Sequence, residues 1–163
     1  MPDILISEAF QACFANQAGS NRKIKSLCLN LSFFLLSLII MSIASFLEKI
    51  NNNIAVSFDE IIAVITENYH YQATEFSNGL NEHILINKAG TNEGSCKIFA
   101  FAQIHQLDQQ QTLKLFGDYY RLDVLNDSQG TSHQNIRNFI KYGWEGICFK
   151  GEALTALTSL PSG

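Results

Sequence analysis

A cysteine, a histidine and an asparagine occur in an order that would support nucleophilic catalysis. Cys96 is predicted to lie in the first turn of a helix, where the helix dipole and the neighbouring Lys97 would favour its thiolate. His133 would then act as the general base, and Asn135 or Glu93 would orient it. No local signature of a known class of cysteine enzyme surrounds these residues. A buried structural cysteine is the alternative, because free cysteine is among the most buried residue types.

The same segment offers groups that would bind a ligand without any reaction. Residues 90–95 form a polar, glycine-flanked loop that leads into the predicted helix, and such a loop can hold an anion on its backbone N–H groups. It lacks the lysine and the spacing of a P-loop, so an ordinary turn is the alternative. The expected partner is a protein or a small anionic ligand. The predicted binding surface combines this loop with His133 and with Asn92, Glu93, Ser95, Arg137, Lys141 and Trp144.

Part of this surface has a second interpretation. His133, Arg137 and Lys141 recur every four residues and therefore form one stripe along a helix, which becomes more positive when the histidine is protonated. A solvated helix face would show the same pattern, since charged side chains are mostly exposed.

Neither a metal nor a cofactor is expected. The four cysteines, Cys13, Cys28, Cys96 and Cys148, include no C-x-x-C pair and no regular spacing, which argues against a zinc site or a disulfide framework. Cys96 and His105 cannot share a metal, because nine residues at about 100° each place them on opposite faces of one helix.

Composition limits the class of protein. The 163 residues suffice for one domain with an appendage, and 47% apolar content with 16% charged residues argues against disorder. The net charge of -4 disfavours binding to nucleic acid through its phosphates, so no nucleic-acid partner is expected.

The first 41 residues have two interpretations. Residues 27–47 carry no charge, and the segment is about as long as a membrane span. It follows a basic cluster, which is typical of a signal or anchor helix. Translation from Met41 is the alternative, and a membrane partner is expected only if residues 27–47 are an anchor. From Ser42 onward the apolar residues Ile43, Phe46, Leu47 and Ile50 follow helical spacing.

Helix-capping residues and the spacing of apolar residues predict further helices and strands in the middle of the chain. A capping box at Ser57 starts a helix over residues 58–69, and a second one at Asp108 starts a helix whose Gly117 is expected to permit close approach of another helix. Between them lie a turn at Asn78-Gly79, a short strand over residues 83–87 and a nearly all-apolar helix, whose apolar residues are Ile98, Phe99, Phe101, Ala102 and Ile104.

The last third of the chain is predicted to form one helix and one strand. The helix is capped by Thr131 to Gln134, and its buried apolar face consists of Ile136, Phe139 and Ile140. It ends at Gly143, after which Trp144 folds back as an apolar contact. The strand over residues 147–150 is expected to pair with residues 83–87. The tail from Ala153 to Gly163 is expected to fray.

The expected fold is mainly α (α+β). We predict a compact bundle of about five helices with a small two-stranded β element, and an N-terminal apolar helix outside the domain. The predicted organisation is an extension over residues 1–41, a helical domain over 42–155 and a tail over 156–163.

Five sequence blocks in this order resemble the HopJ family of type III effector proteins. They are FSNG (76–79), AGTNEGSCKIFAFAQIH (89–105), FGDYYRLDVL (116–125), TSHQNIRNFIKYGWEGI (131–147) and FKGEAL (149–154), and the resemblance runs from about Ser42 to Ala153. The first forty residues have no counterpart in the family pattern, which favours a start at Met41.

The resemblance implies a bacterial effector-type protein, in a family named for translocation into plant cells. It carries no established reaction, so a binding or interaction protein is expected, with no enzymatic activity. A cysteine-dependent hydrolase or transferase using Cys96 and His133, and a membrane-anchored helical domain, are the alternatives. The expected location is the bacterial cytoplasm, or outside it after type III secretion; the alternative is the inner membrane, anchored through residues 27–47.

Overall fold

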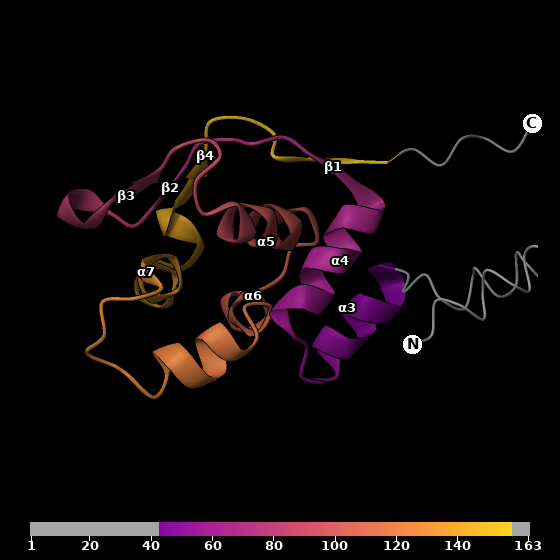
Figure 1. The fold of residues 1–163 in the computed structure, drawn as a ribbon, viewed down its shortest axis with the longest axis horizontal. Coiled ribbons are helices and arrows are strands. Elements are labelled where there is room, and N and C mark those ends of the chain that lie inside the picture. Colours follow the sequence, from indigo (N-terminus) through magenta and orange to yellow (C-terminus); the bar gives the residue numbers. More distant parts are fainter. Residues whose placement is uncertain (1–42, 158–163) are drawn as a thin grey trace, which may run out of the picture. The chain divides into compact units, whose positions relative to one another are not determined.

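The computed structural model describes residues 43–157, which fold as a mainly helical domain with small antiparallel sheets, as predicted (Figure 1). Its α-helices are α3 (Ile43–Asn51), α4 (Phe58–Asn68), α5 (Glu93–Ile104), α6 (Gln109–Lys114) and α7 (Gln134–Tyr142). Within residues 43–157 no helix has the length and apolar character needed to cross a bilayer. The predictions for residues 1–42, which include most of the 27–47 segment, and for residues 158–163 lie outside the described residues.

Five short strands form two sheets. β1 (Tyr69–Tyr71) pairs antiparallel with β5 (Leu154–Ala156), and a three-stranded sheet has the order β3-β2-β4, from β2 (Phe76–Asn78), β3 (Leu85–Asn87) and β4 (Ile147–Phe149). The predicted pairing of residues 147–150 with 83–87 is wrong, because β2 lies between the two strands and pairs with both.

The expected fraying from Ala153 onward is also corrected. Ala153 and Leu154 are buried, and β5 pairs with β1 through to Ala156. Leu154 is the apolar residue that fixes this strand, since its side chain belongs to the main hydrophobic core.

Half of the predicted capping box of α4 is present, because the Glu60 side chain does not return to the Ser57 backbone N–H. The Ser57 hydroxyl accepts a hydrogen bond from the Glu60 backbone N–H at 3.1 Å, and Val56 and Ile61 are both buried, as the hydrophobic staple requires. The Glu60 carboxylate binds the Lys49 ammonium at 2.8 Å and so links α4 to α3.

Helix α5 lies at the centre of the core. Ile98, Phe99, Phe101 and Ala102 are fully buried, as predicted for a helix covered on several sides, and α5 contacts α4, α6 and β5. Ile104 is an exception, because it is 47% exposed at the end of the helix.

The predicted helix after Asp108 is interrupted. Asp108 forms the expected capping box with Gln111, but α6 ends at Lys114, and a separate π-helical turn, η2 (Tyr119–Val124), follows Gly117. Gly117 has a φ of +59°, a backbone conformation that side-chain-bearing residues rarely adopt. A Cβ at Gly117 would lie 2.7 Å from the Phe58 backbone nitrogen, so the expected close approach exists and is directed at the start of α4.

We expect Gly117→Ala to lower the free energy of unfolding by about 3 kcal/mol, because strained φ and a clash between backbones add together. Gly90→Ala is the matched control: Gly90 also has a positive φ, of +82°, but a Cβ there would meet nothing within 4 Å. Its expected cost is about 1 kcal/mol from φ alone. Urea denaturation measures both values, and equal costs would show that the contact with α4 is unimportant.

Helix α7 starts and packs differently from the prediction. His133, not Thr131, is the N-cap residue, and Thr131 instead accepts a hydrogen bond from the Gln134 side chain through its backbone carbonyl. Ile140 is 40% exposed, whereas Asn135 is buried. The buried residues of α7 are Asn135, Ile136 and Phe139, and hydrogen bonds with Asn78 and Asn87 hold Asn135 in the interior.

The C-terminal end of α7 matches the prediction. Gly143 is the C-cap with a φ of +55°, and it opens the short helix η3 (Gly143–Gly146). Trp144 then folds back on the core, where its ring lies 5.1 Å from that of Phe139 and its indole N–H donates to the Leu107 carbonyl. A third short helix, η1 (Asn81–His83), links β2 to β3.

Candidate functional site

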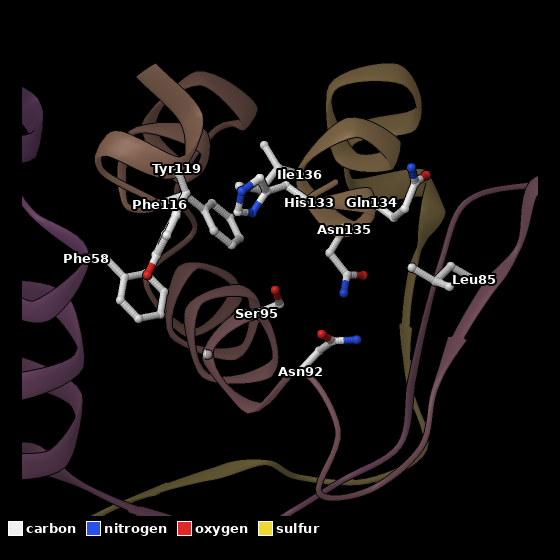
Figure 2. A pocket seen from close by; sticks show the side chains of 11 residues that line it. Phe58, Leu85, Asn92, Ser95, Phe116, Tyr119, His133, Gln134, Asn135 and Ile136 are labelled. Atoms are coloured by element: carbon white, nitrogen blue, oxygen red, sulfur yellow. The ribbon is translucent and has the colours of Figure 1, made fainter. Parts of the chain in front are cut away.

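A cavity of about 590 Å³ opens where α5 and α7 begin (Figure 2). This volume is in the range of small-molecule pockets. Amide and hydroxyl groups occupy one part of the lining and aromatic rings another. The lining residues are Phe58, Leu85, Asn92, Gly94, Ser95, Phe116, Tyr119, His133, Gln134, Asn135 and Ile136.

Both helices begin at this cavity in the same unusual way. Their N-cap residues, Asn92 and His133, adopt the left-handed conformation, with φ of 49° and 53°, and neither side chain caps its helix. Asparagine and histidine tolerate this conformation better than most residues, but it remains sparsely populated and is typical of functional sites. The first turn of each helix is therefore left without side-chain acceptors for its backbone N–H groups.

Four of these backbone donors belong to residues that line the cavity. The N–H groups of Gly94, Ser95, Gln134 and Asn135 have no acceptor within the described part of the chain, since the first backbone bonds of the two helices begin at Cys96 and Ile136. The positive ends of two helix dipoles consequently lie at one cavity.

A network of asparagine amides fixes the two helix starts relative to each other. Asn135 on α7 and Asn87 at the end of β3 exchange hydrogen bonds, with Nδ2 to Oδ1 distances of 2.8 and 3.1 Å. Asn92 donates to the Asn87 Oδ1 at 2.7 Å, and Asn78 on β2 donates to the backbone and side-chain oxygens of Asn135. The network thus joins β2, β3, α5 and α7, and three of its four members are buried.

The network leaves some acceptors and some donors unused: the Oδ1 atoms of Asn78 and Asn92 accept no hydrogen bond from a described residue. The Asn87 and Asn135 Oδ1 atoms each accept two hydrogen bonds, which fills both lone pairs. The Nδ2 groups of Asn92 and Asn135 each donate only one of their two hydrogens to a described residue. The Ser95 hydroxyl, which points into the cavity in Figure 2, has no hydrogen-bond partner among residues 43–157.

The opposite part of the lining is aromatic. The rings of Phe58 and Tyr119 meet edge to face at 5.1 Å, and Tyr119 lies 5.2 Å from the imidazole of His133. The His133 Nε2 lies 3.2 Å from the Asp123 carboxylate. Among the described residues that line the cavity, none carries a carboxylate, an ammonium or a guanidinium group.

The structure brings together four of the residues selected from the sequence: Asn92, Ser95, His133 and Asn135. Four others lie outside the lining. Trp144 is a core contact, the Arg137 Nε donates to the Ser132 carbonyl, the Lys141 ammonium lies over the Tyr142 ring, and Glu93 is exposed beside the loop.

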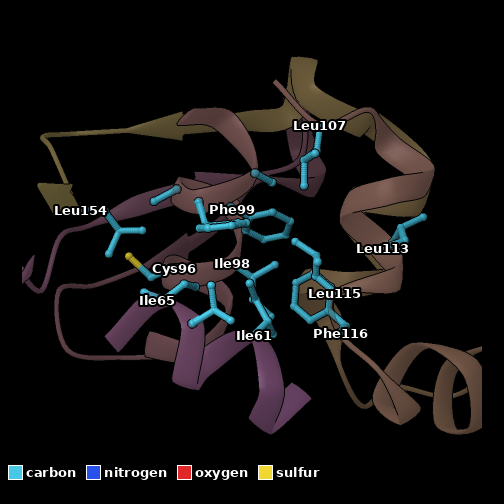
Figure 3. Packing of buried hydrophobic residues seen from close by; sticks show 14 of the residues in the cluster. Ile61, Ile65, Cys96, Ile98, Phe99, Leu107, Leu113, Leu115, Phe116 and Leu154 are labelled. Carbon is cyan, nitrogen blue, oxygen red and sulfur yellow. The ribbon is translucent and has the colours of Figure 1, made fainter. Parts of the chain in front are cut away.

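Cys96 faces the core and not the cavity, as Figure 3 shows by the position of its sulfur among buried apolar side chains. It is 1% exposed, and its thiol donates to the Thr74 carbonyl at 3.6 Å. The predicted lowering of its pKa is wrong: burial raises the pKa of the Cys96 thiol and outweighs Lys97, which lies over the Tyr71 ring. Within the described residues, the structure gives no hydrogen bond between Cys96 and His133.

His105 lies at the C-terminal end of α5, where it is the C-cap residue. Its Nε2 lies 2.7 Å from the Tyr69 hydroxyl, and burial lowers the pKa of the imidazole, which favours the neutral form.

Several residues of the site were not predicted from the sequence. Asn78 was predicted only as part of a turn, and Asn87 only as the last residue of a strand. No local signal marks these residues as one cluster, because Asn78, Asn87 and Asn135 lie in three separate segments of the chain.

Comparison with known proteins identifies the family. The family model described as HopJ type III effector protein matches residues 43–154. The crystal structure of VPA0580, a protein of unknown function, has a TM-score of 0.68 and 42% sequence identity to this chain, over 73% of this chain and 97% of that one. No curated protein matches the chain. Because the family model covers more than half of the 163 residues, this confirms the resemblance seen in the sequence blocks, and the chain belongs to the HopJ family of type III effector proteins.

Proposed function

We propose that this HopJ-family protein is a binding protein whose small-molecule ligand occupies the cavity between the N-termini of α5 and α7. The observation that carries the proposal is the set of hydrogen-bond donors that line the cavity without a partner in the described chain. Because these donors lie on fixed helix starts that their own N-cap side chains do not cap, the cavity is suited to a ligand that supplies acceptors.

The chemistry of the lining favours binding over catalysis. Among residues 43–157 the Ser95 hydroxyl has no hydrogen bond to a base, and the His133 imidazole is hydrogen-bonded neither to Ser95 nor to Cys96. A nucleophile needs a base within hydrogen-bond reach to be activated, and neither Ser95 nor Cys96 has one. The family assignment fits secretion by a type III system, after which such a protein would act by binding.

The proposal is tested by NMR with the ¹⁵N-labelled full-length chain and a mixture of neutral, cationic and anionic fragments. We expect at least one fragment to shift the amide signals of Gly94, Ser95, Gln134 and Asn135 together. Ser95→Leu should abolish these shifts, because its larger apolar side chain enters the cavity beside these amides, whereas Ser128→Leu in an exposed loop should not. Absence of such shifts with every fragment, or unchanged binding in Ser95→Leu, would contradict the proposal.

The cysteine-dependent alternative makes a separate prediction. In the folded protein we expect iodoacetamide to label Cys96 at least about a hundredfold more slowly than the exposed Cys148, because Cys96 is buried and its raised pKa keeps the thiol protonated. Peptide mass mapping after timed quenching distinguishes the two sites, and denaturation in urea provides the control in which both react. Rapid labelling of folded Cys96 near pH 7 would instead favour the enzyme.

A further inference from the structure

We propose that the open edge of strand β3 pairs with the same edge of a second copy of this chain, antiparallel, so that two three-stranded sheets join into one. The pairing surface is the segment 82–88, of which only Leu85 also lines the cavity. Three observations carry the proposal: backbone groups that point outward from the edge, exposed isoleucines on it, and charges that complement themselves in one register.

The backbone bonds of the β2–β4 pairing establish which way each residue of β2 faces. The Gly79 N–H donates to the Gly146 carbonyl at 3.0 Å, and the Lys150 N–H donates to the Glu75 carbonyl at 2.9 Å. Hydrogen-bonded pairs alternate with non-bonded pairs along antiparallel strands. The backbone groups of Ser77 therefore face β4, and those of its two neighbours in β2 face β3.

The outer edge of β3 is consequently open. Leu85 and Asn87 lie opposite the β2 residues that face β3, so their N–H and C=O groups bond to β2. The N–H and C=O groups of Ile86, and of Ile84 in the extended chain before it, point to the other side. No strand of residues 43–157 pairs with β3 on that side, and in Figure 1 β3 lies at the margin of the domain. Outward backbone groups of this kind are a template for a further strand.

The side chains along this edge are apolar and exposed. Ile84 and Ile86 are 49% and 53% exposed. Ile86 lies in one row across the sheet with Ser77 and the exposed Cys148, so this face of the sheet is turned away from the core. Isoleucine favours strand pairing, and a charged side chain is what usually protects an open edge. A second copy on this edge would bury both isoleucines.

Charge and side-chain type select one register. When Leu85 lies opposite Leu85 of the other copy, Ile84 faces Ile86 and Glu82 faces Lys88. Each of these contacts occurs twice, because two-fold symmetry repeats it. The outward backbone groups of the two isoleucines bond to each other in this register, and apolar and opposite-charge pairs across strands stabilise a sheet. An axis through Ile86 would instead place Lys88 opposite Ile84 and lose both matches.

Both charged side chains are available for this contact. The Glu82 side chain is 78% exposed, and within the described chain its ion-pair partner is the neighbouring His83, at 3.6 Å. An exposed pair of this kind contributes little. Lys88 is exposed, and its ammonium forms no ion pair or hydrogen bond among residues 43–157. Pairing of two copies would thus add two ion pairs without breaking a strong contact.

The proposal is tested with the full-length chain by sedimentation equilibrium and amide hydrogen exchange over a range of protein concentration. Concentrations up to about 1 mM populate a small, transient interface. We expect a monomer–dimer equilibrium. The amides of Ile84 and Ile86 should exchange about threefold or more slowly at the highest concentration, whereas those of Leu85 and Asn87, already bonded to β2, should change less.

Charge variants test the register. Glu82→Lys and Lys88→Glu each place like charges opposite each other twice, so each alone should weaken the homodimer about tenfold or more. An equimolar mixture of the two variants should associate as a heterodimer, because every charged pair across the interface is again opposite in sign. Glu67→Lys, at an exposed position of α4, changes the net charge as Glu82→Lys does and should leave the dimer intact. Circular dichroism checks that each variant is folded.

Three outcomes would overturn the proposal. A chain that stays monomeric at every concentration leaves the β3 edge to a different partner. A dimer that both single charge variants leave intact uses another surface. A mixture of the two variants that associates no more strongly than either variant alone contradicts the register.

Discussion

Phe99→Ala is expected to lower the free energy of unfolding by about 3–5 kcal/mol, because it leaves a large cavity at the centre of the core. Phe99 is 0% exposed on α5, and Figure 3 shows it surrounded by other buried side chains. Its ring lies 4.8 Å from that of Phe139 on α7 and 5.4 Å from that of Phe116. Loss of this one ring therefore removes contacts that join α5 to both neighbouring segments.

The size of this effect requires a milder variant and a control. A small domain is stable by about 5–15 kcal/mol, so Phe99→Ala would unfold a protein at the low end of that range. Phe99→Leu keeps most of the volume and should cost about 1–2 kcal/mol. Ile104→Ala, on the same helix but 47% exposed, should cost less than about 1 kcal/mol. Urea denaturation of the three variants gives the order, and a similar cost for Phe99→Ala and Ile104→Ala would refute the central position of this ring.

The second large effect is expected at the asparagine network. Asn87→Ala should lower the free energy of unfolding by about 3 kcal/mol, because Asn87 exchanges two hydrogen bonds with Asn135 and accepts a third from Asn92. Its removal leaves buried amide groups of Asn135 without partners, and such groups are costly to bury. The same change should also broaden the NMR signals of the first turns of α5 and α7, which the network holds together.

A double-mutant cycle separates the network from simple loss of volume. We expect the combined cost of Asn87→Ala and Asn135→Ala to be smaller than the sum of the single costs, since the second change removes a group that the first has already left unpaired. Asn126→Ala, at an exposed position, is the control and should stay within about 0.5 kcal/mol of the parent protein. Additive costs would show that the two amides do not depend on each other.

Local elements were predictable where short-range chemistry determines them. The capped start of α4 at Ser57, the capping box at Asp108 and the end of α7 at Gly143 involve groups only a few residues apart. The apolar character of α5 likewise follows from its own residues, and the ordered sequence blocks identified the family. These features need no knowledge of which distant segments come together.

Errors occurred where a distant contact determines the outcome. The place of β2 between β3 and β4 depends on pairing across more than sixty residues, from Ser77 to Cys148, which no local pattern records. The interruption of the helix at Gly117 depends on the backbone of α4 lying against it. The position of Cys96 was predicted correctly, but its pKa was not, because burial by other segments outweighs the dipole of its own helix.

The candidate site likewise has features that the sequence predicts and features that depend on contacts between distant segments. The sequence by itself determined that polar segments, residues 90–95 and 131–134, lead into two helices, because helix starts depend on neighbouring residues. Only the tertiary structure decided that both starts meet at one cavity, that their donors stay unpaired, and that Phe58 and Tyr119 form the facing wall. The physical reason is that these features involve several segments at once. Which donors of the two helix starts remain unpaired, and whether the helix starts meet, is decided only when β2, β3, α5 and α7 pack together.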